Sequence, residues 1–140
     1  MKIRSMLAAL AVVILGLTLA ACGKGGGGDA SNLKQIAQQR AGDYVVTLLS
    51  ETGQLKQGPN KYVMEVRMAA DNMLVDVGEV RLGSQMAMPG MAPMIGGASA
   101  TPSGTPGRYN VESDFEMRGK WNFQATFGNN QRVMFPVNVQ

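Results

Sequence analysis

The sequence carries one cluster of side chains with distinctive chemistry, four methionines within nine residues: Met86, Met88, Met91 and Met94. Thioether sulfur is a soft, neutral donor that suits copper(I) or silver(I) and discriminates against hard cations. Met86 and Met88 would share one face of a strand, and Pro89-Gly90 can turn the chain so that Met91 and Met94 return toward them. The spacing is typical of a soft-metal site.

A second interpretation of the methionine segment stays open. Methionine is a flexible hydrophobe, and methionine-rich surfaces also bind other proteins. The segment could therefore pack or dock without any metal. Another set of donors, the carboxylates of Glu112, Asp114 and Glu116, alternates along a strand and could attract cations. The pattern favours a solvated sheet face, balanced by basic neighbours such as Arg118 and Lys120.

The composition argues against an enzyme. The chain contains no histidine and a single cysteine. Histidine is the commonest general base at neutral pH and the commonest ligand of zinc and copper(II). Its absence excludes Ser-His-Asp and Cys-His nucleophilic arrangements. No carboxylate, lysine or tyrosine constellation replaces them, so we expect a non-enzymatic protein.

The N-terminal segment has the features of an export signal. Lys2 and Arg4 precede an apolar run that ends in Leu-Ala-Ala before Cys22. The run is shorter than the roughly 20 residues of a membrane-spanning helix. The Leu-Ala-Ala-Cys sequence resembles the lipobox of bacterial lipoproteins. The resemblance implies cleavage after residue 21, a diacylglycerol on Cys22 and acylation of the new amine.

Lipidation would place the protein in the cell envelope, anchored to a membrane on its extracytoplasmic side, at the periplasmic face of the inner or outer membrane. Removal of Lys2 and Arg4 leaves 11 basic residues against 10 acidic ones, so no nucleic-acid partner is expected. The next segment, 22–42, starts with a glycine-rich stretch typical of a flexible tether. Within it, residues 31–40 predict a short helix, with Ser31 as its N-cap.

From residue 43 the hydrophobic pattern changes to a period of two, which indicates strands. The predicted strands cover 44–49, 61–68, 74–82 with a bulge at Gly78, 109–117, 121–127 and 133–139. Gly/Asn turns separate the later strands. We expect an all-β, immunoglobulin-like antiparallel β-sandwich over 43–140, with Trp121 at its centre. Met64, Met68 and Met117 occupy inward positions, whereas 83–107 lacks a pattern and predicts a long loop.

The order of three short motifs resembles the YtkA-like/FixH family of bacterial envelope proteins. The motifs are MAMPGM at 86–91, PGRY at 106–109 and FEMRGKW at 115–121. The resemblance covers roughly 43–140 and implies an immunoglobulin-like module. It also implies a role in copper handling, in cation-pump or oxidase maturation, or in heavy-metal efflux.

The resemblance implies Met86, Met88 and Met91 as copper ligands, with Met117 as a closing ligand. Met94 lies outside the family motif and is a candidate through local spacing only. Because histidine is absent, copper(I) is the expected metal. The expected function is copper(I) delivery or homeostasis by a lipoprotein whose partner is a copper pump, an oxidase or an efflux component. The alternative is an accessory interaction module of an envelope assembly, without a metal of its own.

Overall fold

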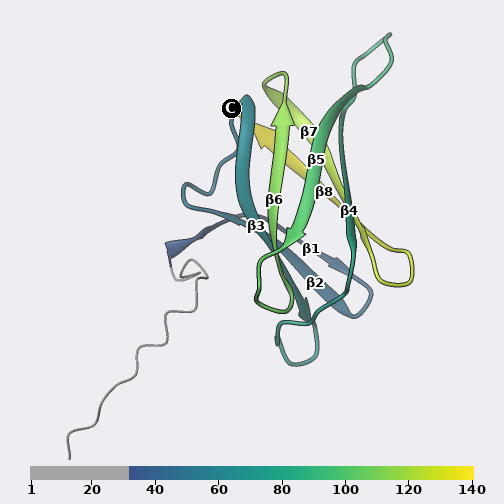
Figure 1. Cartoon of the computed structure of the whole chain (residues 1–140). Coiled ribbons are helices and arrows are strands. Elements are labelled where there is room, and N and C mark those ends of the chain that lie inside the picture. The colour runs from purple at the N-terminus through teal and green to yellow at the C-terminus, as the bar shows by residue number, and fades with distance from the viewer. Residues whose placement is uncertain (1–31) are drawn as a thin grey trace, which may run out of the picture.

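The computed structural model describes residues 32–140, so the predicted signal peptide and Cys22 lie outside the described residues. Over this range the chain forms eight β-strands, shown in Figure 1. They are β1 (Lys34–Ala41), β2 (Tyr44–Ser50), β3 (Gly58–Met68), β4 (Val80–Met86), β5 (Met94–Pro102), β6 (Arg108–Phe115), β7 (Gly119–Phe127) and β8 (Gln131–Val139).

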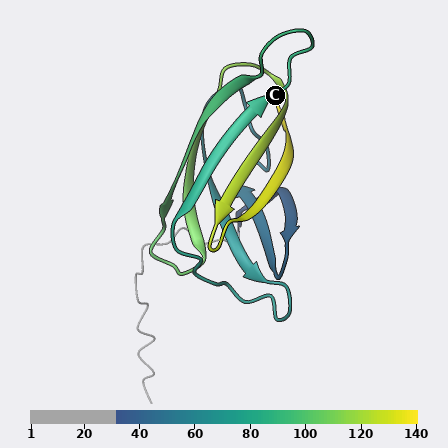
Figure 2. The same ribbon diagram turned by 90° about the vertical axis from the view of Figure 1, so that its right-hand side faces the viewer.

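The strands pair in the order β1-β2-β3-β6-β5-β4-β7-β8, and every neighbouring pair is antiparallel. One layer contains β1, β2, β3 and β6, and the other contains β4, β7 and β8. The two layers face each other in Figures 1 and 2. The predicted immunoglobulin-like β-sandwich is therefore confirmed.

Strand β5 belongs to both layers. Its first residues, Met94–Gly96, pair with β4, whereas Gly97–Pro102 pair with β6. The change of sheet falls at the Gly96-Gly97 step. A Cβ atom at Gly96 would lie 2.5 Å from Ser84 Oγ and 3.1 Å from the Trp121 ring, so only glycine fits this crossing.

The core lies between the layers and is rich in aromatic side chains. Trp121, Phe123 and Phe135 are almost completely buried, and Trp121 packs edge-on against Phe115 at 5.2 Å between ring centroids. Edge-to-face geometry is the preferred arrangement of such rings. Trp121 is thus the central packing residue predicted from the sequence.

Three predictions about local structure are wrong. Residues 34–41 form strand β1 instead of the predicted helix, so the sandwich begins before residue 43. Residues 83–107 contain most of β4 and all of β5 instead of one long loop. The strand predicted over 74–82 starts only at Val80, and Gly78, with φ of 74°, lies in the connection before it rather than in a bulge.

The connection between β3 and β4 passes from one layer to the other and is fixed by Tyr109. The Tyr109 hydroxyl accepts the Val77 N–H at 3.2 Å and donates to the Gly78 carbonyl at 3.0 Å. Burial raises the pKa of Tyr109 above its ordinary value of 10.0. The hydroxyl therefore stays protonated and keeps the crossover in place at neutral pH.

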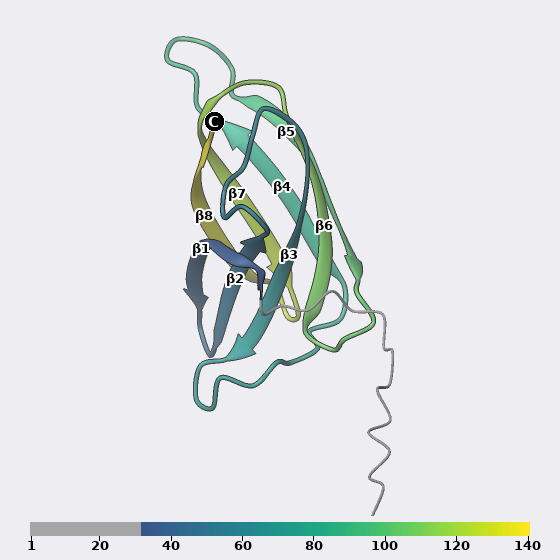
Figure 3. The same cartoon turned by 90° about the vertical axis from the view of Figure 1, so that its left-hand side faces the viewer.

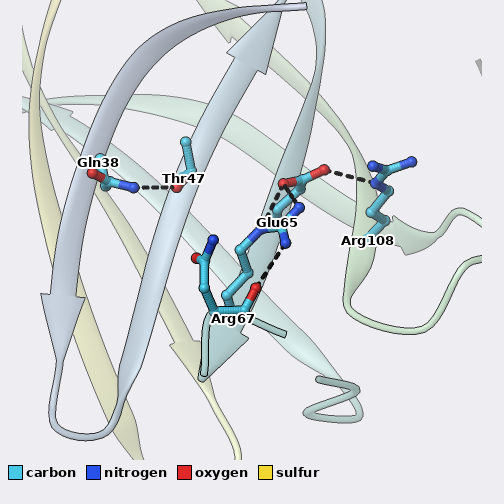
Figure 4. A network of polar contacts seen from close by, with 6 residues as sticks. Gln38, Thr47, Glu65, Arg67 and Arg108 are labelled. Atoms are coloured by element: carbon cyan, nitrogen blue, oxygen red, sulfur yellow. Dashed lines mark hydrogen bonds and ion pairs between the residues drawn. The ribbon is translucent and has the colours of Figure 1, made fainter. Parts of the chain in front are cut away.

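A buried carboxylate sits on the outer face of the first layer. Glu65 is 5% exposed, and its Oε1 accepts from Arg108 Nε at 2.7 Å. Its Oε2 accepts from Arg67 Nη2 at 2.9 Å, as Figure 4 shows. Beside this pair, Gln38 donates to Thr47 at 3.0 Å. The row of polar contacts crosses four strands and satisfies a charge that would otherwise be costly to bury.

We expect Glu65→Gln to lower the free energy of unfolding by roughly 1–3 kcal/mol, because two guanidinium groups lose their charged acceptor. Urea denaturation followed by the fluorescence of Trp121 measures the change. Glu112→Gln is the matched control, because its ion pair with Lys61 has side chains 64% and 85% exposed. The control should lose less than about 1 kcal/mol. Equal losses in the two variants would contradict the structural role of Glu65.

Alkaline pH should destabilise the domain through two buried tyrosines. Burial raises the pKa of both Tyr62 and Tyr109, so the folded state holds their protons more tightly than the unfolded chain. Their contribution to stability is complete below about pH 10 and falls as the pH rises above it. Urea denaturation between about pH 8 and 11 should show a steeper decline for the wild type than for Tyr62→Phe/Tyr109→Phe. An equal decline in the free energy of unfolding of the two proteins would show that these tyrosines do not cause the loss of stability at alkaline pH.

Candidate metal centre

The methionine segment forms a β-hairpin at one end of the sandwich. Strand β4 ends at Met86, β5 begins at Met94, and these two residues are direct cross-strand partners. Between them, the Met91 N–H donates to the Met88 carbonyl at 3.1 Å across Pro89 and Gly90. The φ of 72° at Gly90 fits a type II turn, in which proline presets the first corner and glycine supplies the second. The turn predicted at Pro89-Gly90 is therefore confirmed.

The four hairpin methionines differ in their contact with solvent. Met86 and Met94 are half-buried and pack against the hydrophobic core. Met88 is also half-buried, whereas Met91 is 69% exposed. The hairpin thus carries two thioethers at its base, packed against the core, and two on its turn.

The turn between β6 and β7 lies at the same end of the sandwich as the hairpin. Figure 3 shows the hairpin projecting beyond this end of the sandwich. Met117 lies in this turn and is 41% exposed, so the prediction that it is a core residue is wrong. The carbonyl of Met117 accepts the Trp121 indole N–H at 2.9 Å, which ties the turn to the core. A fifth methionine therefore lies on a turn at the same end of the domain as the hairpin.

Gly119 brings the turn and the hairpin into contact. A Cβ atom there would lie 2.6 Å from the terminal methyl of Met86. Gln85 of β4 is the cross-strand partner of Asn122 of β7. One position further toward the hairpin lie Met86 on β4 and Trp121 on β7, so these two side chains face the core side by side. The sequence pattern did not predict that Gly119 and Trp121 lie beside the candidate ligands, because their positions depend on how β4 and β7 pair.

The five predicted ligands thus gather at one end of the domain. Four lie on the hairpin and Met117 lies on the neighbouring turn. Met94 was predicted from spacing alone, and the structure makes it the direct cross-strand partner of another candidate ligand, Met86. The remaining exposed methionines, Met73 and Met134, lie on other segments, the β3–β4 connection and the middle of β8.

Three charged side chains are exposed on the β6–β7 turn or next to it: Glu116, Arg118 and Lys120. Within residues 32–140, no group of three or more His, Cys, Asp or Glu side chains is placed to hold a metal ion. The carboxylates of Glu112 and Asp114 are exposed on β6, where Glu112 pairs with Lys61 at 3.2 Å. The candidate ligands predicted at the hairpin are themselves neutral thioethers.

The part of the chain that the structure describes contains no helix long and apolar enough to cross a membrane.

Comparisons with known proteins identify one family, and the solved structures that the chain resembles include two distant ones. The model of the family described as YtkA-like matches residues 38–126. The filamin domain of Lin-41 is 9% identical, with a TM-score of 0.49 over 74% of this chain and 98% of that one. Domains 4 and 5 of the S-layer protein SbsC are 19% identical, with a TM-score of 0.42 over 76% and 51% of the two chains. No curated protein matches the chain.

We expect Gly119→Ala to destabilise the domain by roughly 1–3 kcal/mol, chiefly because the φ of 132° disfavours a side chain; the terminal methyl of Met86, which the added methyl meets, must also move aside. Thermal unfolding measures the loss. In Gly119→Ala/Met86→Ala the clash disappears, so the two losses should sum to more than the loss of the double variant. Purely additive losses would show that Met86 does not rest on Gly119.

Proposed function

Since the chain belongs to the YtkA-like family, we propose that it is a copper(I) carrier that binds its ion through the thioethers of the β4–β5 hairpin. The cross-strand pair of Met86 and Met94 carries the proposal, because two soft donors are held side by side. Met88 and Met91 on the turn and Met117 on the β6–β7 turn bring the candidate thioethers to five, and three or four of them are enough to bind copper(I). Copper(I) is cargo in this proposal, and the protein catalyses no reaction.

The neutral ligands suit a carrier that must also release its ion. Thioethers bind copper(I) more weakly than thiolates do, and none of the proposed ligands has to lose a proton. The side chains around Met86 and Met94 exclude water from one side of the site, whereas Met91 faces solvent. An acceptor could therefore approach the ion from the side of the turn and take it by exchange of ligands.

We also propose where the carrier works. The lipobox-like sequence before Cys22 supports a lipid anchor on the extracytoplasmic face of a membrane in the cell envelope. The acceptor would be an envelope protein with soft ligands of its own, such as a copper pump, an oxidase or an efflux component. Thioethers also keep their reduced form more readily than free thiols in an oxidising compartment.

A second candidate function rests on the exposed apolar surface of the hairpin. Met91 is 69% exposed and Ile95 is 68% exposed, although both are large hydrophobic side chains. Such residues are favoured in surfaces that bind other proteins. In this alternative the hairpin docks on an envelope protein as an accessory module, and no metal takes part.

The two functions are separated by Met86→Leu/Met88→Leu/Met91→Leu, which removes sulfur but nearly conserves apolar volume. We expect the wild-type domain to take up about one copper(I) or silver(I) ion and the triple variant to lose most of this affinity. Titration calorimetry measures uptake under reducing conditions. The fluorescence of Trp121, the sole tryptophan, should be quenched by an ion bound beside Met86.

The matched control is Met73→Leu/Met134→Leu, in which two exposed methionines away from the hairpin lose their sulfur. The control should bind silver(I) as the wild type does. Undiminished binding by the hairpin variant would show that the ligands are wrong. A domain that takes up neither ion would leave docking as the better account of the hairpin.

A further inference from the structure

We infer that Met91 is a site of reversible oxidation, and that its conversion to the sulfoxide weakens the metal site proposed above without unfolding the domain. This inference rests on the proposed function, because it concerns the same group of ligands. Three features of the hairpin support it: the exposure of the sulfur, the geometry of the turn and the packing of the other ligands.

Exposure separates Met91 from the other methionines of the hairpin. Its side chain is 69% exposed, whereas Met86, Met88 and Met94 are half-buried. Met64, in the centre of the core, has no exposure at all. An oxidant dissolved in water reaches a thioether in proportion to the access it has to the sulfur. Met91 should therefore react before the other hairpin ligands.

The turn allows Met91 to change without a change in the backbone. Its N–H donates to the Met88 carbonyl, and Pro89 and Gly90 fix the corner, so the side chain has no part in holding the turn. Met86 is different, because its methyl group rests on Gly119. A polar sulfoxide at Met86 would have to be buried or the packing would break, which costs free energy.

The chemistry needs only a peroxide. The thioether sulfur donates an electron pair to one peroxide oxygen, the O–O bond breaks, and the products are a sulfoxide and water. Sulfur is oxidised by two electrons and the peroxide is reduced by two. The product presents a polar oxygen where a soft donor stood, so its affinity for copper(I) or silver(I) falls. Methionine sulfoxide reductases reverse the change.

The first test treats the metal-free mature domain with dilute hydrogen peroxide and follows each methionine by peptide mass spectrometry. Met73 is the internal control, because it is 64% exposed but lies on the β3–β4 connection. We expect Met91 and Met73 to oxidise at similar rates, at least about five-fold faster than Met94. Silver(I), which does not react with peroxide as copper(I) does, should then protect Met91 and leave Met73 unprotected.

The second test measures silver(I) affinity after oxidation. In the Met73→Leu/Met134→Leu background, domain oxidised at Met91 should bind silver(I) about ten-fold more weakly, and so should Met91→Gln, which places a polar amide there. The circular dichroism of the oxidised domain should not change, and a methionine sulfoxide reductase should restore its binding of silver(I).

The outcomes separate this inference from the proposed function. Faster oxidation of Met86 or Met94 than of Met91, or full affinity after oxidation of Met91, overturns the inference while silver binding still stands. Unfolding upon oxidation of Met91 alone overturns it as well. A reduced wild-type domain that does not bind silver(I) overturns the proposed function itself.

Discussion

The close approach of the two sheets at Gly96 is the constraint on which the rest of the candidate site depends. Strand β5 leaves one layer and joins the other at Gly96-Gly97, and its backbone passes against Ser84 and Trp121. No side chain larger than hydrogen fits there without displacing its neighbours. Because β5 changes sheet only at Gly96-Gly97, two residues after Met94, Met94 remains paired with Met86 at the rim of the core.

The rim position gives the hairpin two kinds of methionine. Met86 and Met94 are cross-strand partners that pack against the core, which limits their rotamers. Met88 and Met91 belong to the turn, where the conformation depends on proline and glycine instead of on packing. In the proposed metal site, Met86 and Met94 would be preorganised ligands and Met91 an accessible one, and preorganisation lowers the entropic cost of binding an ion.

Two buried polar side chains far from the hairpin stabilise the sheets on which it is built. Tyr109 fixes the crossover between the layers, and Glu65 holds Arg67 and Arg108 on the outer face. Both are polar groups buried with partners, as buried polar groups must be. They stabilise the sheets at places remote from the hairpin.

The sequence predicted most of the strands because their alternation is strong. The predictions from the sequence were wrong at β1 and β5, for different reasons. Residues 34–41 contain glutamine and alanine, which suit a helix, and only pairing with β2 makes them a strand. Strand β5 is made of small residues, such as Ala98 and Ala100, whose alternation with Ser99 and Thr101 gives a weak hydrophobic signal.

The candidate ligands were all present in the sequence, because sulfur chemistry is a property of residue type and the Pro89-Gly90 turn is a property of local conformation. The absence of histidine, and with it the exclusion of the commonest catalytic and metal-binding arrangements, was likewise determined by composition. Only the tertiary structure decided that Met86 is the partner of Met94, that Met117 lies on a turn instead of in the core, and that Gly119 and Trp121 support the site. These relations depend on strand register and on the change of sheet by β5, and both arise from packing between segments far apart in the chain.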